Sequence, residues 1–338
     1  MYRQRRASRL KPLAEAAPTI AETVGDFFSP AFLGKGGCFN GDAFEILDTI
    51  PAESIDLVIT SPPYWGLRTY GREHNWDIAK EWEAESGSIE IAPSYAWYRQ
   101  HGGILGLEPT PDWFISNLLE FFTKAGRTLK PRGSMWINLG DTYFARWSSI
   151  RINGRQGLGD QTRVRRRTPM GRYRQEKNLM LIPSRFAIAM QEQRWILRND
   201  LIWFKPNVPP RNEGDRLRLT HEHFFHFVKR PTEGRAKYYY NLRDTETGAN
   251  DVVTCNVRAG DGGHSATFPS ELIRPRILSS CPKGGVVLDP FCGTGRSLVE
   301  AIHFDRYGLG IELSEMFHAT AVRNMTAAAE YQQLCLTP

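Results

Sequence analysis

The sequence has 338 residues, of which 41% are hydrophobic and 24% are charged, a composition typical of a soluble globular protein with one large core or two smaller ones. No apolar run reaches the length of a membrane-spanning helix, and no signal-peptide core follows the first residues, so a cytoplasmic protein without membrane contact is expected. The formal net charge of +6 suits a polyanionic partner but does not by itself show one.

The first part of the chain predicts a loose lead-in followed by one helix and one strand. Residues 1–36 are punctuated by prolines and begin with the basic stretch MYRQRRASRLK. The stretch NGDAFEIL predicts a short helix, and IDLVIT (residues 55–60) predicts a buried strand of the parallel type. Pro62 and Pro63 end that strand, because proline cannot donate to the ladder.

Two segments in the middle of the chain are predicted to be insertions. Residues 66–108 are rich in Trp, Tyr, Gly and charge, and residues 146–177 carry ten Arg or Lys but two acids. The second segment is predicted to be a flexible loop or to become ordered on a polyanion. Apolar periodicity predicts the elements around them, namely a helix from Pro111 to about 130, a strand over 134–141, a helix over 181–193, a strand or hairpin over 195–206 and a strand over 221–229.

The last third alternates helices and strands. The pattern predicts helices over 268–281, 297–304 and 315–333, with strands over 285–289 and 307–313. Strands that alternate with helices indicate an α/β fold with a doubly wound, mostly parallel twisted sheet. We expect one domain over 37–325, with a connection at 244–263 and a C-terminal tail at 326–338.

A glycine-rich turn between a strand and a helix predicts a ligand site. VVLDPFCGTGRS (residues 286–297) lets the backbone approach a ligand closely, and the helix N-terminus favours an anionic group. Glu312 ends the next strand, where an acid can accept hydrogen bonds from both ribose hydroxyls. The two features together suit S-adenosylmethionine. NAD would use the same acid, but its pyrophosphate normally needs a fuller set of glycines.

DPFCGTG and TSPPYW together resemble the motifs of DNA amino-methyltransferases. Their order, with SPPY first, resembles the circularly permuted beta class. The resemblance implies a class I methyltransferase-like fold, S-adenosylmethionine as cofactor and duplex DNA as substrate, with the catalytic domain over 37–325. It implies that Asp42 contacts the cofactor's adenine and that the segment around Phe268 packs near the cofactor. The implied cofactor-binding residues are Asp42, Thr267, Phe268, Asp289, Phe291, Gly293, Thr294, Gly295 and Glu312.

The SPPY element, Ser61–Pro62–Pro63–Tyr64, suits activation of an exocyclic base amine, whose lone pair is delocalised into the ring. The Ser61 side-chain oxygen and the Pro62 carbonyl can accept the two N–H bonds and aim the lone pair at the methyl group, while Pro63 makes the turn rigid. Tyr64 can stack on a base flipped out of the duplex, and Trp65 can extend that surface. The transfer is expected to be direct, without a covalent intermediate.

In the family that the sequence resembles, a tetrad led by serine is mostly associated with methylation of cytosine N4, and one led by aspartate with adenine N6. The resemblance therefore implies cytosine N4 as the target, with adenine N6 as the near alternative. Cytosine C5 chemistry is not expected, because its cysteine follows a proline and no Pro-Cys dipeptide occurs here. An RNA methyltransferase and a non-catalytic nucleic-acid-binding module are further alternatives. A cognate restriction endonuclease that shares the DNA site is a further expected partner.

The arginine-rich segment is expected to contact DNA phosphates, through Arg163, Arg165, Arg166 and Arg167. The stretch HEHFFHF (residues 221–227) invites a metal interpretation, but it lacks the H-E-x-x-H spacing and would place its histidines on two strand faces. The five cysteines form no C-x-x-C pair. No metal site is therefore predicted.

Overall fold

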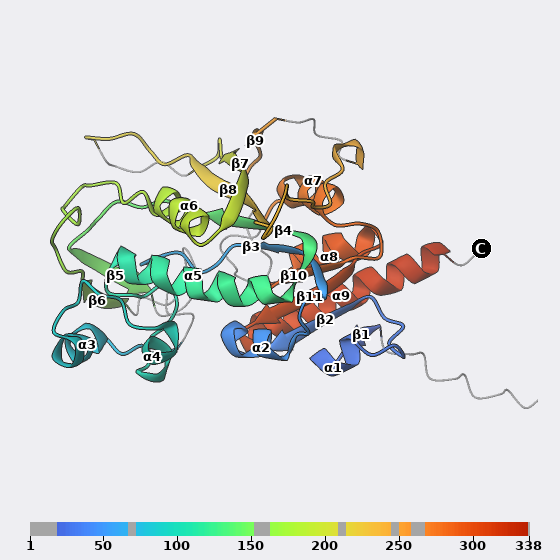
Figure 1. Ribbon diagram of the computed structural model, residues 1–338, viewed down its shortest axis with the longest axis horizontal. Coiled ribbons are helices and arrows are strands. Elements are labelled where there is room, and N and C mark those ends of the chain that lie inside the picture. Colours follow the sequence, from blue (N-terminus) through green and yellow to red (C-terminus); the bar gives the residue numbers. More distant parts are fainter. Residues whose placement is uncertain are drawn as a thin grey trace, which may run out of the picture.

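A mixed, mostly parallel nine-stranded sheet forms the centre of the molecule (Figure 1). The computed structural model describes residues 19–66, 72–151, 163–208, 214–244, 250–257 and 268–336. The strand order is β1 (Ile20–Ala21), β2 (Gly36–Asn40), β11 (Tyr307–Glu312), β10 (Val286–Asp289), β3 (Ile55–Thr60), β4 (Leu129–Leu139), β8 (His221–Lys229), β7 (Trp195–Phe204) and β9 (Val252–Thr254). The first six strands of this order, from β1 through β11 and β10 to β4, pair in parallel with their neighbours. Strand β8 is antiparallel to both β4 and β7.

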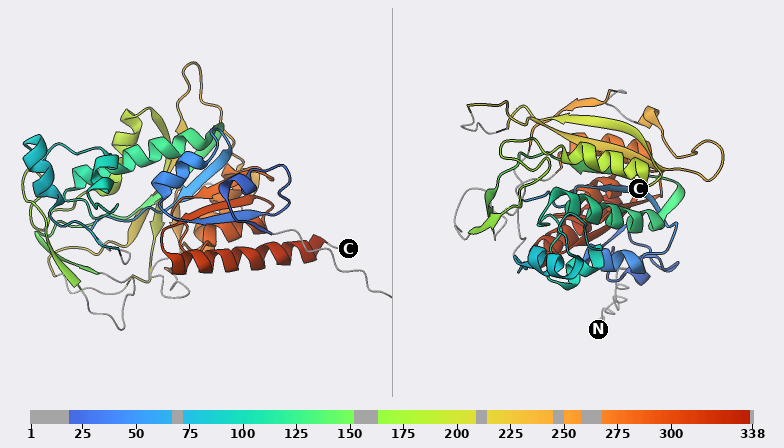
Figure 2. Two further views of the ribbon diagram at one scale, coloured as in Figure 1. Left: turned by 90° about the horizontal axis from the view of Figure 1, so that it is seen from below. Right: turned by 60° about the vertical axis from the view of Figure 1, so that its left-hand side comes forward.

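Helices cover both faces of the sheet, because successive side chains of the buried strands point to opposite faces. Val58 of β3 packs in a cluster with α2 (Ala43–Thr49), α5 (Pro111–Thr128) and α6 (Ile182–Glu192). Its neighbours Leu57 and Ile59 pack in another cluster with α7 (Ser270–Ser280) and α8 (Arg296–His303). Helix α9 (Glu315–Leu336) contacts α8 and β2 (Figures 1 and 2). The predicted doubly wound fold is confirmed.

Several predicted elements form where local signals are strong. Helix α5 begins at Pro111, and the Thr110 hydroxyl accepts a hydrogen bond from the Trp113 amide at 3.3 Å as its N-cap. Strand β3 occupies the predicted residues and ends just before Ser61. No helix in the described parts of the chain is both long and apolar enough to cross a membrane.

The structure differs from the predictions at both ends of the domain. The predicted lead-in contributes β1 and α1 (Val24–Phe27), and β1 pairs with β2. Helix α9 continues to Leu336, and Ala328 and Ala329 are buried against α8 and β2, so the predicted tail 326–338 is wrong over 326–336. The predicted connection at 244–263 contains β9 and follows the short helix η1 (Leu242–Asp244).

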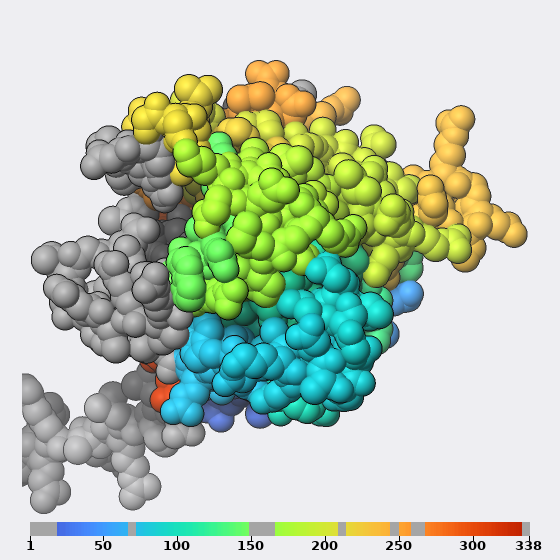
Figure 3. Space-filling model, turned by 90° about the vertical axis from the view of Figure 1, so that its left-hand side faces the viewer, coloured from blue at the N-terminus to red at the C-terminus, as the bar shows by residue number. Residues whose placement is uncertain are grey.

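Both predicted insertions contain regular structure and lie side by side at one end of the molecule (Figures 2 and 3). The first holds α3 (Ile78–Ser86) and α4 (Tyr95–Gln100), and α4 contacts α5. In the second, β5 (Trp147–Arg151) and β6 (Arg163–Arg167) form an antiparallel hairpin. The buried Arg174 joins the two segments, because its guanidinium binds Glu90 as well as Asp112 at the start of α5.

Candidate active site

One edge of the sheet gathers the predicted functional residues. The parallel strands β2, β11, β10, β3 and β4 end there, and β7 ends there too, because it is antiparallel to β8 and therefore runs in the same direction as β4. The amino end of β8 lies at the same edge. The sheet changes winding direction between β10 and β3, the place where ligands bind in open α/β sheets.

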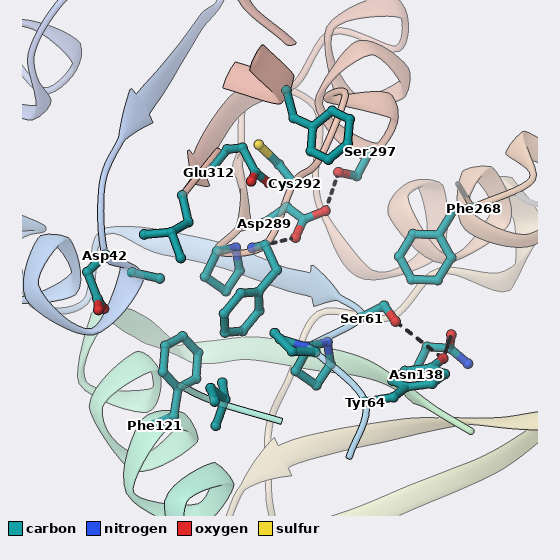
Figure 4. Close-up of a pocket in the computed structure, with 18 of the residues that line it drawn as sticks. Asp42, Ser61, Tyr64, Phe121, Asn138, Phe268, Asp289, Cys292, Ser297 and Glu312 are labelled. Carbon is teal, nitrogen blue, oxygen red and sulfur yellow. Dashed lines mark hydrogen bonds between the residues drawn. The ribbon is translucent and has the colours of Figure 1, made fainter. Parts of the chain in front are cut away.

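A cavity at this edge is lined by residues that lie at the ends of these strands or directly follow them (Figure 4). Of the predicted site residues, Asp42, Ser61, Pro62, Pro63, Tyr64, Phe268, Asp289, Phe291, Thr294 and Glu312 line it. Asn138, Trp203, Lys205 and Glu222 line it as well, although the sequence did not indicate them. The glycine-turn end and the SPPY end therefore open into one continuous space.

Asp289 fixes the start of the glycine turn. Its carboxylate accepts hydrogen bonds from the Thr60 hydroxyl at 2.6 Å, the Ser297 hydroxyl at 2.5 Å and the Phe291 amide at 3.1 Å. Burial raises the pKa of Asp289 to about 6, although these bonds lower it in part. The side chain thus ties β3, the glycine turn and α8 together.

Glu312 holds the other side of the turn. One carboxylate oxygen accepts from the Gly293 amide at 2.9 Å and the other from the Ser314 amide at 2.8 Å. Gly293 and Gly295 adopt positive φ angles of 56° and 80°, which favour glycine. Burial raises the pKa of Glu312. A carboxylate has about four acceptor positions, so two remain for ribose hydroxyls.

The part of the cavity near α2 is both aromatic and charged. Phe291 packs against Phe121 with ring centroids 4.7 Å apart, and both rings line the cavity. The Asp42 carboxylate accepts from the Phe44 amide at 2.8 Å as the N-cap of α2 and forms an ion pair with Arg99 at 2.8 Å. This arrangement offers an apolar surface next to a fixed carboxylate, which suits a purine ring.

Phe268 lines the opposite side of the cavity and stacks on Phe224, with ring centroids 5.6 Å apart. Thr267, predicted to contact the cofactor with it, lies outside the described residues. Thr294 is buried in the glycine turn, and its carbonyl accepts a hydrogen bond from Asn324 of α9 at 3.0 Å.

The SPPY residues stand at the end of β3, where the prolines stop the ladder. The Tyr64 hydroxyl lies 3.3 Å from the Ser61 hydroxyl and 2.8 Å from both Asn138 Oδ1 and Glu222 Oε2. Figure 4 shows Ser61, Tyr64 and Asn138 grouped opposite Asp289 and beside Phe268. The predicted stacking role of Tyr64 stays a prediction, and its hydroxyl has polar partners that the sequence did not indicate.

Glu222 and Lys205 come from β8 and from the end of β7. Lys205 Nζ donates to Glu222 Oε1, and the two side chains are largely buried. Glu222 lies inside the HEHFFHF stretch, whose histidines are the more conspicuous candidates for chemistry. The one signal available was position, since the first residues of an antiparallel neighbour meet the carboxyl ends of the parallel strands.

Trp65 and Arg166, two of the predicted DNA contacts, are buried. Trp65 Nε1 and Arg166 Nη2 both donate to the backbone carbonyl of Glu108, and the guanidinium lies 5.2 Å from the indole ring centroid. The Glu108 carboxylate, whose pKa burial raises to about 7, accepts from the Gly106 amide and from Asn117. The expected DNA contact by these two side chains is therefore wrong for this conformation, in which they tie the hairpin to the SPPY loop.

Arg167 is exposed, 5.9 Å from the Trp147 ring centroid. The strand includes Arg163 and Arg165, whose side chains lie outside the described parts.

His226 is buried and stacks on Trp136, with ring centroids 4.5 Å apart. Burial lowers the pKa of His226 to about 3, so the ring is neutral. The described residues contain no group of three His, Cys, Asp or Glu side chains that could hold a metal ion.

Comparisons with known proteins identify the family of the chain. The family model described as "DNA methylase" matches residues 55–323. The chain is 34% identical over 304 residues to the Type II methyltransferase M.Cfr9I of Citrobacter freundii, covering 88% of this chain and 89% of that protein. It is also 34% identical to M.SmaI of Serratia marcescens over 291 residues, 83% of this chain and 87% of that protein.

Solved structures share the fold. The PvuII DNA methyltransferase (cytosine-N4-specific) superposes with a TM-score of 0.58 at 18% identity, covering 88% of this chain and 92% of the other. The M1.HpyAVI–SAM complex has a TM-score of 0.50 at 17% identity, covering 85% and 98%. These likenesses identify the fold.

Proposed function

Because the chain belongs to the DNA methylase family, we propose that it methylates the exocyclic N4 amine of cytosine in duplex DNA. The observation that carries the proposal is the continuous cavity that joins Glu312 and the glycine turn to Ser61 and Pro62. A donor held at the first end can present its methyl group to an amine held at the second. The related Type II methyltransferases suggest that a restriction endonuclease cutting the same DNA site accompanies the protein.

The cofactor is S-adenosylmethionine, and the cavity residues fit it. Glu312 has acceptor positions left for ribose hydroxyls, and the apolar surface formed by the adjoining rings of Phe121 and Phe291 suits the adenine. The cofactor supplies an electrophilic methyl group on a sulfonium. The task of this chain's residues is to hold the target amine in line with that group.

At the SPPY end, Ser61 Oγ and the Pro62 carbonyl are the two acceptors proposed for the amine N–H bonds. Such bonds draw the nitrogen lone pair out of conjugation with the base ring and fix its direction. The amine is reached after base flipping, which costs a few kcal/mol. The cytosine preference rests on the resemblance of the Ser-led tetrad, and adenine N6 is the second candidate.

The β5–β6 hairpin is proposed to hold the DNA backbone. Residues two apart on a strand share a face, so positions 163, 165 and 167 lie on the face opposite position 166. Position 166 is buried against Glu108, which leaves the other face for a polyanion. Because Arg166 also touches Trp65, the hairpin stands next to the SPPY loop.

Nucleoside analysis tests this function. The protein is incubated with S-adenosylmethionine carrying a deuterated methyl group and with unmethylated DNA, which is then digested and analysed by mass spectrometry. Labelled 4-methylcytosine is expected, and Ser61→Ala should lose it while retaining cofactor binding. Labelled 6-methyladenine would replace the proposal with its second candidate, and no labelled nucleoside across varied DNA would overturn both.

A further inference from the structure

The Ser61 hydroxyl is the first member of a chain of hydrogen bonds that ends on a carboxylate. Ser61 Oγ lies 3.3 Å from Tyr64 Oη, and Tyr64 Oη lies 2.8 Å from Glu222 Oε2. All three side chains line the cavity. They come from the end of β3 and from the start of β8, strands that meet at this edge because β4 lies between them and pairs antiparallel with β8.

The surroundings fix the direction of these bonds. Asn138 Nδ2 donates to the His223 carbonyl at 3.0 Å, which turns Asn138 Oδ1 toward Tyr64. The tyrosine O–H therefore faces two acceptors, Asn138 Oδ1 and Glu222 Oε2, and gives its hydrogen in their direction. In the contact between Ser61 and Tyr64, Ser61 is then the donor. Its oxygen lone pairs remain as acceptors toward the cavity.

Glu222 is held in place for this contact. Lys205 Nζ donates to its other oxygen, Oε1, so that Oε2 faces Tyr64. Gly140 lies against the pair: a Cβ added there would stand 2.8 Å from Tyr64 Cε2 and 3.3 Å from Glu222 Cγ. The tyrosine ring and the carboxylate thus approach each other at a point where a larger residue does not fit.

We propose that Glu222 is the terminal proton acceptor of the methyl transfer, reached from the target amine through Ser61 and Tyr64. This inference rests on the proposed amino-methyl transfer and holds for either base, since both candidates use an exocyclic amine. Glu222 acts through the two hydroxyls and need not touch the substrate. Lys205 and Asn138 are positioning residues that keep the carboxylate and the tyrosine in line.

The step balances without a further reactant. The amine lone pair forms the N–C bond while the S–C bond of the sulfonium breaks, leaving a neutral thioether and a positively charged nitrogen with one proton too many. That proton passes to Ser61 Oγ, the Ser61 proton to Tyr64 Oη, and the Tyr64 proton to Glu222 Oε2. A protonated exocyclic amine is a far stronger acid than a carboxylic acid, so the transfer runs downhill. Glu222 later releases the proton to solvent.

Two nearly isosteric variants test the relay. Tyr64→Phe keeps the ring but removes the hydroxyl, and Glu222→Gln keeps the shape but removes the acceptor. Single-turnover methyl transfer is measured with wild-type protein and both variants on saturating cofactor and DNA. Each variant should be slower by roughly 100-fold, the lower end for general acid–base catalysis. The double variant should be little slower than either one, because both interrupt one chain.

Binding measurements separate a relay from a structural effect. Cofactor affinity and base flipping, the latter followed by fluorescence of 2-aminopurine at the target position, should stay within about threefold of wild type. Glu222→Asp should recover part of the rate, and Asp200→Asn, which alters an acid outside the cavity on the neighbouring strand, should leave it unchanged. Methylation by wild type together with full rates for Tyr64→Phe and Glu222→Gln would overturn the relay alone. A wild-type protein that methylates no DNA would instead overturn the proposed function.

Discussion

Replacing Asp289 by asparagine should stabilise the cofactor-free protein at neutral pH. It should also remove the part of the pH dependence of the unfolding free energy that comes from this side chain. The side chain is buried, and burial raises its pKa from the ordinary 3.8 to about 6. That rise corresponds to about 3 kcal/mol of unfavourable free energy for the ionised form in the folded state. The described contacts of the carboxylate include no cation that would be left without its partner, since its three donors are two hydroxyls and an amide.

Asparagine can keep the hydrogen bonds. Its oxygen can replace Oδ1, which accepts from Thr60 and from the Phe291 amide, and its NH₂ group can donate to Ser297, whose hydroxyl can turn to accept. The variant therefore removes the cost of the buried charge, and this gain is reduced by the Ser297 O–H and the second amide N–H, which must find other acceptors. We expect a gain of up to about 3 kcal/mol in the free energy of unfolding at pH 7.5.

The sign of the pH dependence follows from the direction of the pKa shift. As the pH falls through 6, the folded wild-type protein takes up a proton on Asp289 before the unfolded chain does, so its stability rises relative to the variant. Between pH 7.5 and 4.5 the gap should close by about 2 kcal/mol. Urea unfolding of both proteins at several pH values measures the gap, and the other acids cancel because both proteins share them. A gap that does not change with pH, or a variant less stable throughout, would refute the reasoning.

Three further predictions concern the cavity and the hairpin. Gly140→Ala should lower turnover at least tenfold without changing cofactor affinity, because the new Cβ would displace Tyr64 or Glu222; steady-state kinetics with calorimetric titration separates the two effects. Glu312→Gln should weaken S-adenosylmethionine binding by roughly 10- to 100-fold, measured by the same titration, because it loses an acceptor of the Gly293 or Ser314 amide as well as the proposed ribose contact. Arg166→Ala and the neighbouring Arg167→Ala form a matched pair: the first should cost about 3 kcal/mol of stability in urea unfolding, whereas the second should leave stability unchanged and reduce the slope of log DNA affinity against log salt by about 1.

The sequence predicted those parts of the fold that local chemistry determines. Strand β3 ends at Pro62 because proline lacks the N–H, and α5 begins at Thr110–Pro111 because both residues suit a helix start. Strand β2 was missed, since GGCFN has two glycines and no β-branched residue. Its strand geometry comes from pairing with β11 and from close packing, because a Cβ at Gly36 would stand 2.5 Å from Met325 of α9.

The site divides in the same way. Gly293 of the glycine turn and Glu312, which share a hydrogen bond, are only 19 residues apart in the sequence. Both were therefore predicted from spacing within one strand–helix–strand unit. Glu222 meets Tyr64 across 158 residues of sequence, and that contact depends on which strand lies beside β4. Arg166 shows the converse, because its charge suggested DNA but Glu108 and Trp65, far earlier in the chain, bury it.

These long-range contacts also bear on why a serine can lead the tetrad. A hydroxyl accepts hydrogen bonds less strongly than a carboxylate, yet Ser61 donates its own proton toward Tyr64, which in turn faces Glu222. The negative charge that an aspartate would bring to position 61 is thus present two hydrogen bonds away. An aspartate there would meet the Tyr64 oxygen with no proton between them, unless the tyrosine turned its hydrogen away from Glu222 and Asn138. On this reasoning, the neutral serine and the largely buried glutamate form one functional unit, in which each requires the other.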